Sequence, residues 1–169
     1  DAIAFLTGAG LMPSDAELRH VGVATESPLP VDGQTPPSEG KPVRYTFDFG
    51  RRAGSGLEVD GYNGEGITVS VGDQGVVYFR HLWRELSEQS IVTGDSPRLT
   101  RDQAVEAAKV AAIRSGATQE ELTIDDGSLV YFSPSVSEAT TELHLAWRIT
   151  VNGWPYFVEA TTGEILREH

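Results

Sequence analysis

The stretch Leu143-His-Leu-Ala-Trp-Arg-Ile-Thr-Val151, followed by Asn152-Gly153 and then by residues 154–160, decides the fold of this chain. Its apolar residues occupy every second position and include β-branched and aromatic types, which is typical of a strand with one buried face. Asn-Gly between two such runs is a strong signal for a tight hairpin turn. The stretch therefore predicts two antiparallel strands, and the turn at 161–163 predicts a short final strand over 164–167.

A helix is predicted ahead of this hairpin. Thr100 and Gln103 stand at the spacing of a capping box, in which each side chain bonds to the backbone of the other residue. Small residues follow on the same helix: Ala104, Ala107, Ala108, Ala111 and Ala112. Because Gly116 is a typical helix stop, we expect a helix over about 101–115, and then a strand over 128–133.

The first part of the chain shows a similar succession of patterns. We expect a helix that ends at Gly10 and strands with alternating apolar residues. The predicted helix covers 2–9, and the predicted strands cover 19–24, 43–49, 67–71 and 76–82. Residues 25–42 are rich in Pro, Gly and Ser and predict a long connector, and the Gly-rich excursion over 51–66 is expected to contain a short strand near 57–59.

These patterns predict an α+β protein with two similar halves, over 1–95 and 96–169. Each half has a helix followed by an antiparallel meander, and we expect one helix to cover each sheet. The matching order favours an internal duplication. The alternative is that two generic helix-plus-meander units look alike by chance.

Composition excludes several classes of function. The chain has 169 residues and a formal charge of −12, from 25 acidic and 13 Lys and Arg residues. Binding to nucleic acid or to an anionic membrane needs a basic face, which dispersed basic residues do not provide. The chain has no cysteine, so disulfides, thiolate zinc sites and thiol nucleophiles are excluded.

No run approaches the roughly 20 apolar residues of a membrane-spanning helix, so we expect no membrane insertion by this segment. No signal peptide is recognisable. The chain opens at Asp1 inside a predicted helix, and we expect a preceding segment that carries a signal or an anchor.

No catalytic motif stands out, and we predict neither catalytic nor cofactor-binding residues. The four histidines, His20, His81, His144 and His169, do not have the spacing of a metal site on one helix. No nucleophile elbow is present, and the glycines over 54–66 are not followed by the Lys and Ser or Thr of a phosphate loop. We interpret them as a hairpin tip.

One loop has a weak metal-binding signal. Asp60, Asn63 and Glu65 place oxygen ligands close together, as calcium requires. The loop lacks the alternating acidic pattern and the distal bidentate Glu of an EF-hand. Turn chemistry explains these residues better, so calcium is the weaker interpretation.

The aromatic residues suggest a partner surface. Trp147 has the buried parity of its strand, whereas Trp83 stands at a strand end and Trp154 at the hairpin. Exposed aromatic residues are frequent at protein interfaces, so we assign Trp83, Trp154 and Tyr62 to a candidate partner surface. Packing between the halves is the alternative explanation for these residues.

The second half resembles a PepSY-type domain. The resemblance rests on residues 100–108 of the predicted helix, on Leu145-Ala-Trp-Arg-Ile149, and on the closing motif Val158-Glu-Ala-Thr-Thr-Gly-Glu-Ile-Leu166. It covers about 98–167, and the first half is similar only in outline. The tandem arrangement is also similar to the extracellular parts of membrane-anchored regulators of bacterial sensor kinases.

The resemblance implies a non-enzymatic protein that works outside the cytoplasmic membrane of a bacterium. PepSY-type domains occur in protease propeptides and in envelope proteins, and no catalytic residues are associated with them. We therefore expect a secreted or membrane-anchored regulatory module that binds another protein, either a peptidase or an envelope sensor. The alternative is an envelope domain that binds a small ligand or calcium.

Overall fold

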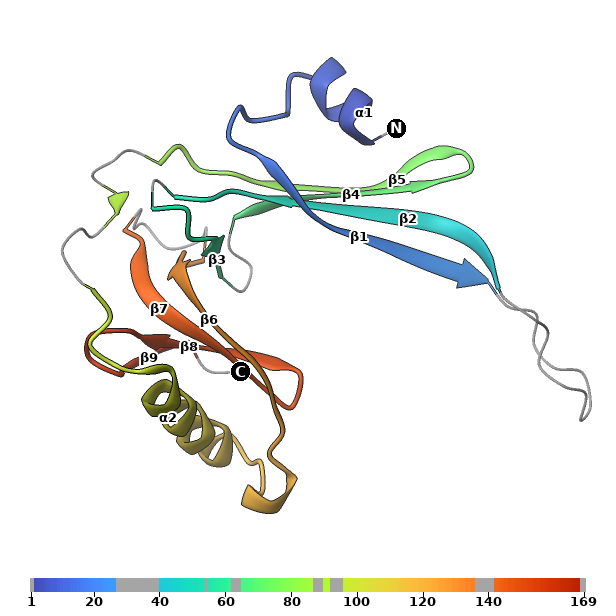
Figure 1. Cartoon of the computed structure of the whole chain (residues 1–169). Helices are drawn as coiled ribbons and strands as arrows, with labels where there is room; N and C mark the ends of the chain where they lie inside the picture. The colour runs from blue at the N-terminus through green and yellow to red at the C-terminus, as the bar shows by residue number, and fades with distance from the viewer. Residues whose placement is uncertain are drawn as a thin grey trace, which may run out of the picture. The chain divides into compact units, whose positions relative to one another are not determined.

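A computed structural model shows two compact units, each built from a helix and an antiparallel meander of four strands (Figure 1). The structure describes residues 2–26, 40–53, 55–61, 65–86, 90–91, 96–135 and 142–167. The chain is thus α+β, as predicted. Among these residues, no helix is both long and apolar enough to cross a membrane.

The first unit contains residues 1–51 and 66–83. Its elements are α1 (Ala2–Gly8), β1 (Glu17–Glu26), β2 (Lys41–Gly50), β4 (Gly66–Gly72) and β5 (Gly75–Leu82). The strands lie in the order β1-β2-β4-β5, and all neighbours are antiparallel. Helix α1 packs on one face of this sheet through Ala2 and Leu6, which are buried against Phe49, Ile67 and Val69.

The second unit contains residues 52–65 and 84–169. Its elements are β3 (Val59–Asp60), α2 (Arg101–Arg114), the short 3-10 helix η2 (Gln119–Glu121), β6 (Ile124–Phe132), β7 (His144–Val151), β8 (Trp154–Glu159) and β9 (Ile165–Arg167). The sheet order is β3-β6-β7-β8-β9. Asn152 and Gly153 both have positive φ angles, 52° and 77°, which is the conformation that the predicted Asn-Gly hairpin turn requires.

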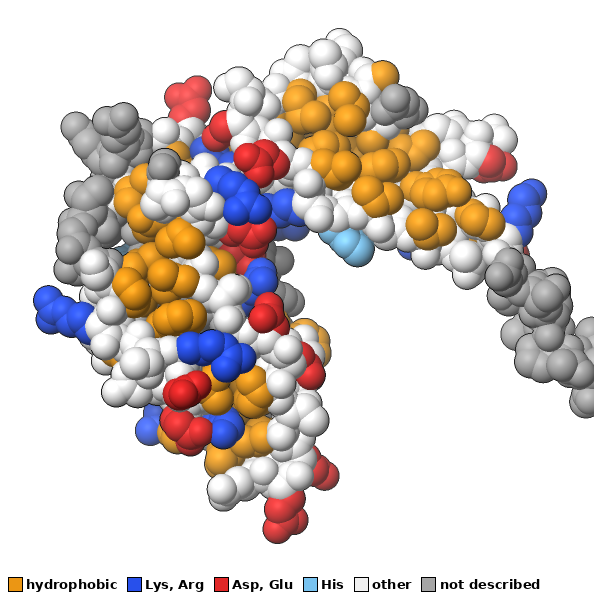
Figure 2. Space-filling view, in the orientation of Figure 1, with side chains coloured by type: hydrophobic (Ala, Val, Ile, Leu, Met, Phe, Trp, Pro, Cys, Tyr) orange, Lys and Arg blue, Asp and Glu red, His pale blue; other side chains and the backbone are white. Residues whose placement is uncertain are grey.

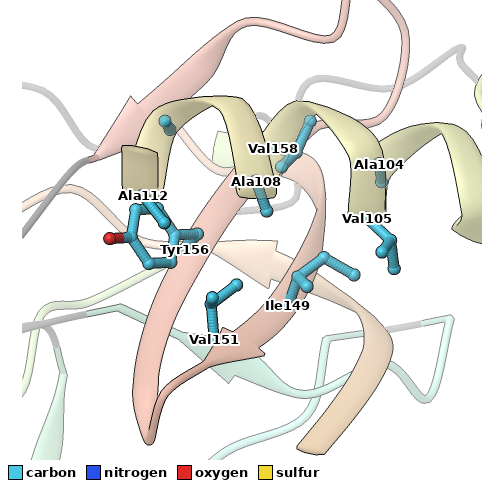
Figure 3. Close-up of a cluster of buried hydrophobic side chains, with 9 residues drawn as sticks. Ala104, Val105, Ala108, Ala112, Ile149, Val151, Tyr156 and Val158 are labelled. Carbon is cyan, nitrogen blue, oxygen red and sulfur yellow. The ribbon is translucent and has the colours of Figure 1, made fainter. Parts of the chain in front are cut away.

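Helix α2 begins and ends as predicted. Thr100 accepts a hydrogen bond from the Gln103 backbone N–H, and the Gln103 side chain accepts one from the Thr100 N–H, which completes the capping box. The alanine stripe then lies flat on β7 and β8, where small side chains let the helix approach the sheet closely (Figure 3). The buried cluster consists of Ala104, Val105, Ala108, Ala111, Ala112, Ile149, Val151, Tyr156 and Val158.

The division of the chain differs from the expected boundary at residue 95. Residues 52–65 belong to the second unit, although they lie in sequence between two strands of the first unit. There β3 pairs in parallel with β6, so that Val59 lies beside Tyr131. A short strand near 57–59 was expected in this stretch, and β3 lies at its end. Its pairing with β6 could not be predicted, because a two-residue strand has no periodicity of its own and its partner is distant in the sequence.

The second-unit sheet is apolar on both faces. The alternation in 143–151 predicted one buried face, but Ala146, on the opposite face of β7, is also fully buried. It packs with Val130, Phe132 and Phe157, whose ring centroid lies 4.9 Å from that of Phe132. Expecting a single buried face was therefore wrong for this strand, because alanine on a face of mixed polarity gave no signal.

Substitution of Gly61 tests the attachment of β3. A Cβ atom at this position would lie 2.1 Å from the backbone oxygen of Ser133, which cannot move aside as a side-chain end can. We expect Gly61→Ala to lower the free energy of unfolding by about 2 kcal/mol, measured by urea denaturation. At Gly127 the nearest atom belongs to the flexible Arg101 side chain, so Gly127→Ala should cost clearly less. Equal losses would contradict the close approach.

Candidate functional site

The sheet of the first unit has an apolar face, and among the described elements α1 covers one end of it only. We call the residues of its uncovered part the open face: Val21, Val23, Val43, Tyr45, Phe47 and Val71. They share one side of the sheet because Val21 pairs with Phe47, and Val23 with Tyr45. Along β2 the side chains pass from exposed, through half-buried, to buried at Phe49 and Gly50. Val23 remains 53% exposed and Tyr45 44% exposed.

Helix length explains the uncovered end. A helix rises about 1.5 Å per residue and a strand about 3.3 Å. The seven residues of α1 therefore extend about 10 Å, whereas the ten residues of β2 extend about 33 Å. In the second unit, the 14 residues of α2 extend about 21 Å, and the strand β7 beneath it has only eight residues. The helix there covers most of its strand.

The open face and α1 form a continuous apolar surface. Figure 2 shows hydrophobic side chains gathered over α1 and along the strands beside it. Ile3 and Phe5 of α1 are themselves exposed, and the ring of Phe5 lies edge-on against Phe79 of β5, with centroids 5.5 Å apart. A contiguous apolar surface of this kind is typical of an interaction site, whereas single exposed apolar residues are ordinary.

A shallow hollow of about 540 Å³ lies at the uncovered end of this face. Val43, Tyr45 and Val71 line it with apolar atoms, and Glu26, Lys41 and Asp73 stand among its lining residues. The hollow thus combines an apolar surface with charges of both signs, which is the usual composition of an interface core and its rim.

The β1 edge of the same sheet is less suited to binding than the face of the sheet. Strand β1 is an edge strand, but its pairing with β2 shifts register between Leu18 and His20 and again between Ala24 and Thr25. Irregularities of this kind twist an edge and discourage the addition of a further strand. The open face is therefore the stronger candidate of the two.

Trp83, one of the predicted partner residues, is used inside the first unit. The guanidinium carbon of Arg51 lies 4.2 Å from the centroid of its ring, and Arg51 is only 5% exposed. Arg51 also lies 3.3 Å from a carboxylate oxygen of Asp15. Trp83 itself packs against the cluster beneath α1. This arrangement accounts for Trp83 as a structural residue, and its role toward a partner stays a prediction.

Trp154 is the predicted partner residue that the structure leaves exposed, at 53%. It lines a hollow of about 360 Å³ in the second unit, between the end of α2 and the β7–β8 hairpin. Tyr62, the third predicted residue, lies outside the described residues. The structure thus shows that Trp83 and Trp154 have different environments, although their positions in the sequence look equivalent.

The weak calcium candidate has its carboxylates engaged with arginines. Asp60 accepts a hydrogen bond from Arg148 at 2.7 Å, and Glu65 accepts one from Arg84 at 3.1 Å. Asn63 lies outside the described residues. In the part of the chain that the structure describes, no three His, Asp or Glu side chains gather as a metal site would require. Calcium binding here stays an untested prediction.

The ion pair between Arg148 and Asp60 is partly buried, and it stabilises the charged form of Arg148. Burial by itself would lower the pKa of Arg148, but the hydrogen bond and charge of Asp60, with the charges of Glu58 and Asp126, outweigh burial and raise this pKa. The guanidinium therefore stays protonated throughout the physiological range. The pair joins Asp60 of β3 to β7, and Arg84, which donates hydrogen bonds to Glu65 and to the Pro134 carbonyl, links Glu65 to the residues that follow β6.

Sequence reasoning missed the open face. Its residues alternate as buried strand residues do, and the sequence pattern predicts one helix covering each sheet. The signal that could have found it was the short helical stretch before Gly10, set against ten-residue strands.

The sequence matches no family of known proteins and no curated protein at a significant level. Among solved structures, the chain is similar to one described as the Bacillus megaterium YpeB C-terminal domain, with 14% sequence identity and a TM-score of 0.44. The match covers 99% of this chain and 62% of that one. The chain therefore spans less than two thirds of the length of that structure.

Replacement of Arg148 tests how β3 is held. Arg148→Met removes the pair with Asp60 and leaves a carboxylate that is largely buried, so we expect a loss of about 2 kcal/mol in the free energy of unfolding. Because the folded pKa of Arg148 lies above its unfolded value, its contribution is complete below the unfolded pKa and is lost only as pH rises through the folded one. The loss on substitution should therefore be constant between pH 6 and pH 10.

Urea denaturation at several pH values measures this loss. Lys109→Met is the matched control, because it removes an exposed pair with Glu106 that should contribute about 0.5 kcal/mol or less. A loss for Arg148→Met no larger than for the control would contradict the role of the pair.

Proposed function

We propose that this chain is a non-catalytic binding and regulatory module that recognises another protein through the open face. The observation that carries the proposal is the apolar surface formed by Val21, Val23, Val43 and Tyr45, which no described element of the chain covers. Partial exposure of strand valines and a tyrosine costs free energy in water, and a partner that covers them recovers it.

The magnitude indicates what kind of contact is needed. Full burial of a large apolar side chain contributes about 1.5 to 3 kcal/mol, so completing the burial of four half-exposed ones contributes roughly 4 kcal/mol. Association itself costs about 4 kcal/mol or more in lost freedom. The open face alone therefore does not suffice, and the partner must also contact neighbouring apolar residues such as Ile3 and Phe5 of α1.

The PepSY-type resemblance of the second half supports a location outside the cytoplasm, with an envelope sensor or a peptidase as the partner. The same proposal includes that the two units are a tandem repeat of one kind of domain. Its support is the shared order of elements, because in each unit a helix precedes four strands that follow one another in the sheet, apart from the inserted β3.

A second candidate function is the binding of a small ligand. The specific observation that favours it is the hollow of about 360 Å³ beside Trp154, which falls within the usual range of small-molecule sites. The two functions are distinguishable, since the hollow belongs to the second unit and the open face to the first.

Substitution within the open face tests the leading proposal. Thr keeps the strand preference of Val while removing apolar surface, so the double variant Val23→Thr with Tyr45→Thr should fold normally. With the chain as bait in an envelope extract of its source organism, we expect the wild type to capture a specific protein and the double variant to lose at least nine tenths of it. Quantitative mass spectrometry of the captured proteins measures this.

The matched control is Val110→Thr, which changes a similarly exposed valine on α2 and should capture as the wild type does. Capture that is unchanged in the double variant, or the absence of any specific protein, would count against the open face as the binding site.

A further inference from the structure

The hollow of the second unit is lined by apolar and by uncharged polar side chains, at the edge of the hydrophobic core. It lies where the last turn of α2 meets the β7–β8 hairpin. Its lining residues are Ala112, Ser115, Ala117, Val151, Asn152, Trp154 and Tyr156. Apolar side chains form part of this lining, Trp154 is 53% exposed, and Ser115, Asn152 and Tyr156 carry polar groups. None of the seven residues is charged.

Tyr156 combines a buried ring with a hydroxyl group that is not fully enclosed. The residue is only 5% exposed and packs in the buried cluster beneath α2. Its hydroxyl points away from Val151 and lies beside Ala112 in Figure 3. Among the described residues it forms no hydrogen bond, and it is not fully enclosed either. The hydroxyl is therefore accessible to a hydrogen-bonding atom of a ligand that enters the hollow.

The electrostatics of the hollow favour a cation. Ser115 caps the C-terminal end of α2, which carries the negative end of the helix dipole. Outside the lining, at the β7–β8 hairpin, the Asp125 carboxylate accepts a hydrogen bond at 3.3 Å from the N–H of Gly153, the residue before Trp154. The exposed face of an indole ring attracts cations through its quadrupole. Arg114 is the neighbouring cation in the sequence, but it does not line the hollow.

We propose that this hollow binds the ammonium or guanidinium group of a lysine or arginine side chain presented by a partner polypeptide. The aliphatic stem of that side chain packs on Ala112, Ala117 and Val151. Its charged end lies against the Trp154 ring and donates a hydrogen bond to the Tyr156 hydroxyl. The inference deepens the proposed function by adding a second contact of stated chemistry, in the unit that does not carry the open face.

The first test uses N-acetyl-lysine methylamide as the probe, with the whole 15N-labelled chain. A single side chain should bind weakly, with a Kd of roughly 1 mM or above. We expect a saturating shift of the Trp154 indole resonance, while the indoles of Trp83 and Trp147 stay in place. The isostere N-acetyl-norleucine methylamide has the same stem without the charge and should bind at least about 5-fold more weakly. The difference should shrink in 1 M salt.

Variants then test the two groups that face the ligand. Trp154→Leu should weaken binding of the lysine probe by about 5-fold or more, and Tyr156→Phe by about 3- to 10-fold. Tyr156→Phe removes only the hydroxyl, so the fold is retained and the amide spectrum confirms it. Val110→Thr is the control and should bind as the wild type does.

Three results would overturn the inference. One is equal binding of the norleucine and lysine probes, which would make the hollow merely apolar. Another is binding of a neutral hexose such as glucose with no response to lysine, which would make it a sugar site. The third is unchanged lysine binding by Tyr156→Phe and Trp154→Leu. The open-face double variant should bind the lysine probe normally, so failure here is separate from failure of the proposed function.

Discussion

An antiparallel sheet with an apolar face must have that face covered, and this requirement determines the behaviour of both units. In the second unit α2 meets it, because 14 residues with an alanine stripe lie flat across β7 and β8. In the first unit α1 meets it only near Phe49, Ile67 and Val69. A helix rises less per residue than a strand does, so a seven-residue helix is too short to cover ten-residue strands. The open face is the direct consequence of that difference.

The elements that could be predicted are those whose signals lie within a few residues of one another. The capping box at Thr100 and Gln103 satisfies backbone groups three residues apart, and the Asn152-Gly153 turn depends on two adjacent φ angles. The position of β3 depends instead on a hydrogen bond between Arg148 and Asp60, 88 residues apart in the chain. No local pattern carries that information, which is why residues 52–65 looked like a hairpin tip of the first half.

The candidate sites show the same division between local and distant information. Trp83 and Trp154 both stand at strand ends and were indistinguishable as sequence features. Only the placement of Arg51 over one ring separates them. Tyr156 alternates correctly for a core residue and is one, and its pattern cannot reveal that its hydroxyl forms no hydrogen bond to another described residue. Val23 and Tyr45 likewise have the alternation of buried residues, because what is missing is the cover and not the pattern.

An uncovered apolar face on a chain with a charge of −12 has a further physical consequence. The net charge makes copies of the chain repel one another, which opposes self-association through that face at moderate ionic strength. The same charge attracts a basic partner and raises its rate of encounter, whereas apolar contact contributes mainly to how long the complex lasts. A partner with an apolar surface and nearby lysine or arginine side chains provides both the electrostatic attraction and the apolar contact. A second copy of this acidic chain provides apolar contact but no attraction, and so a different protein is the better match to the open face.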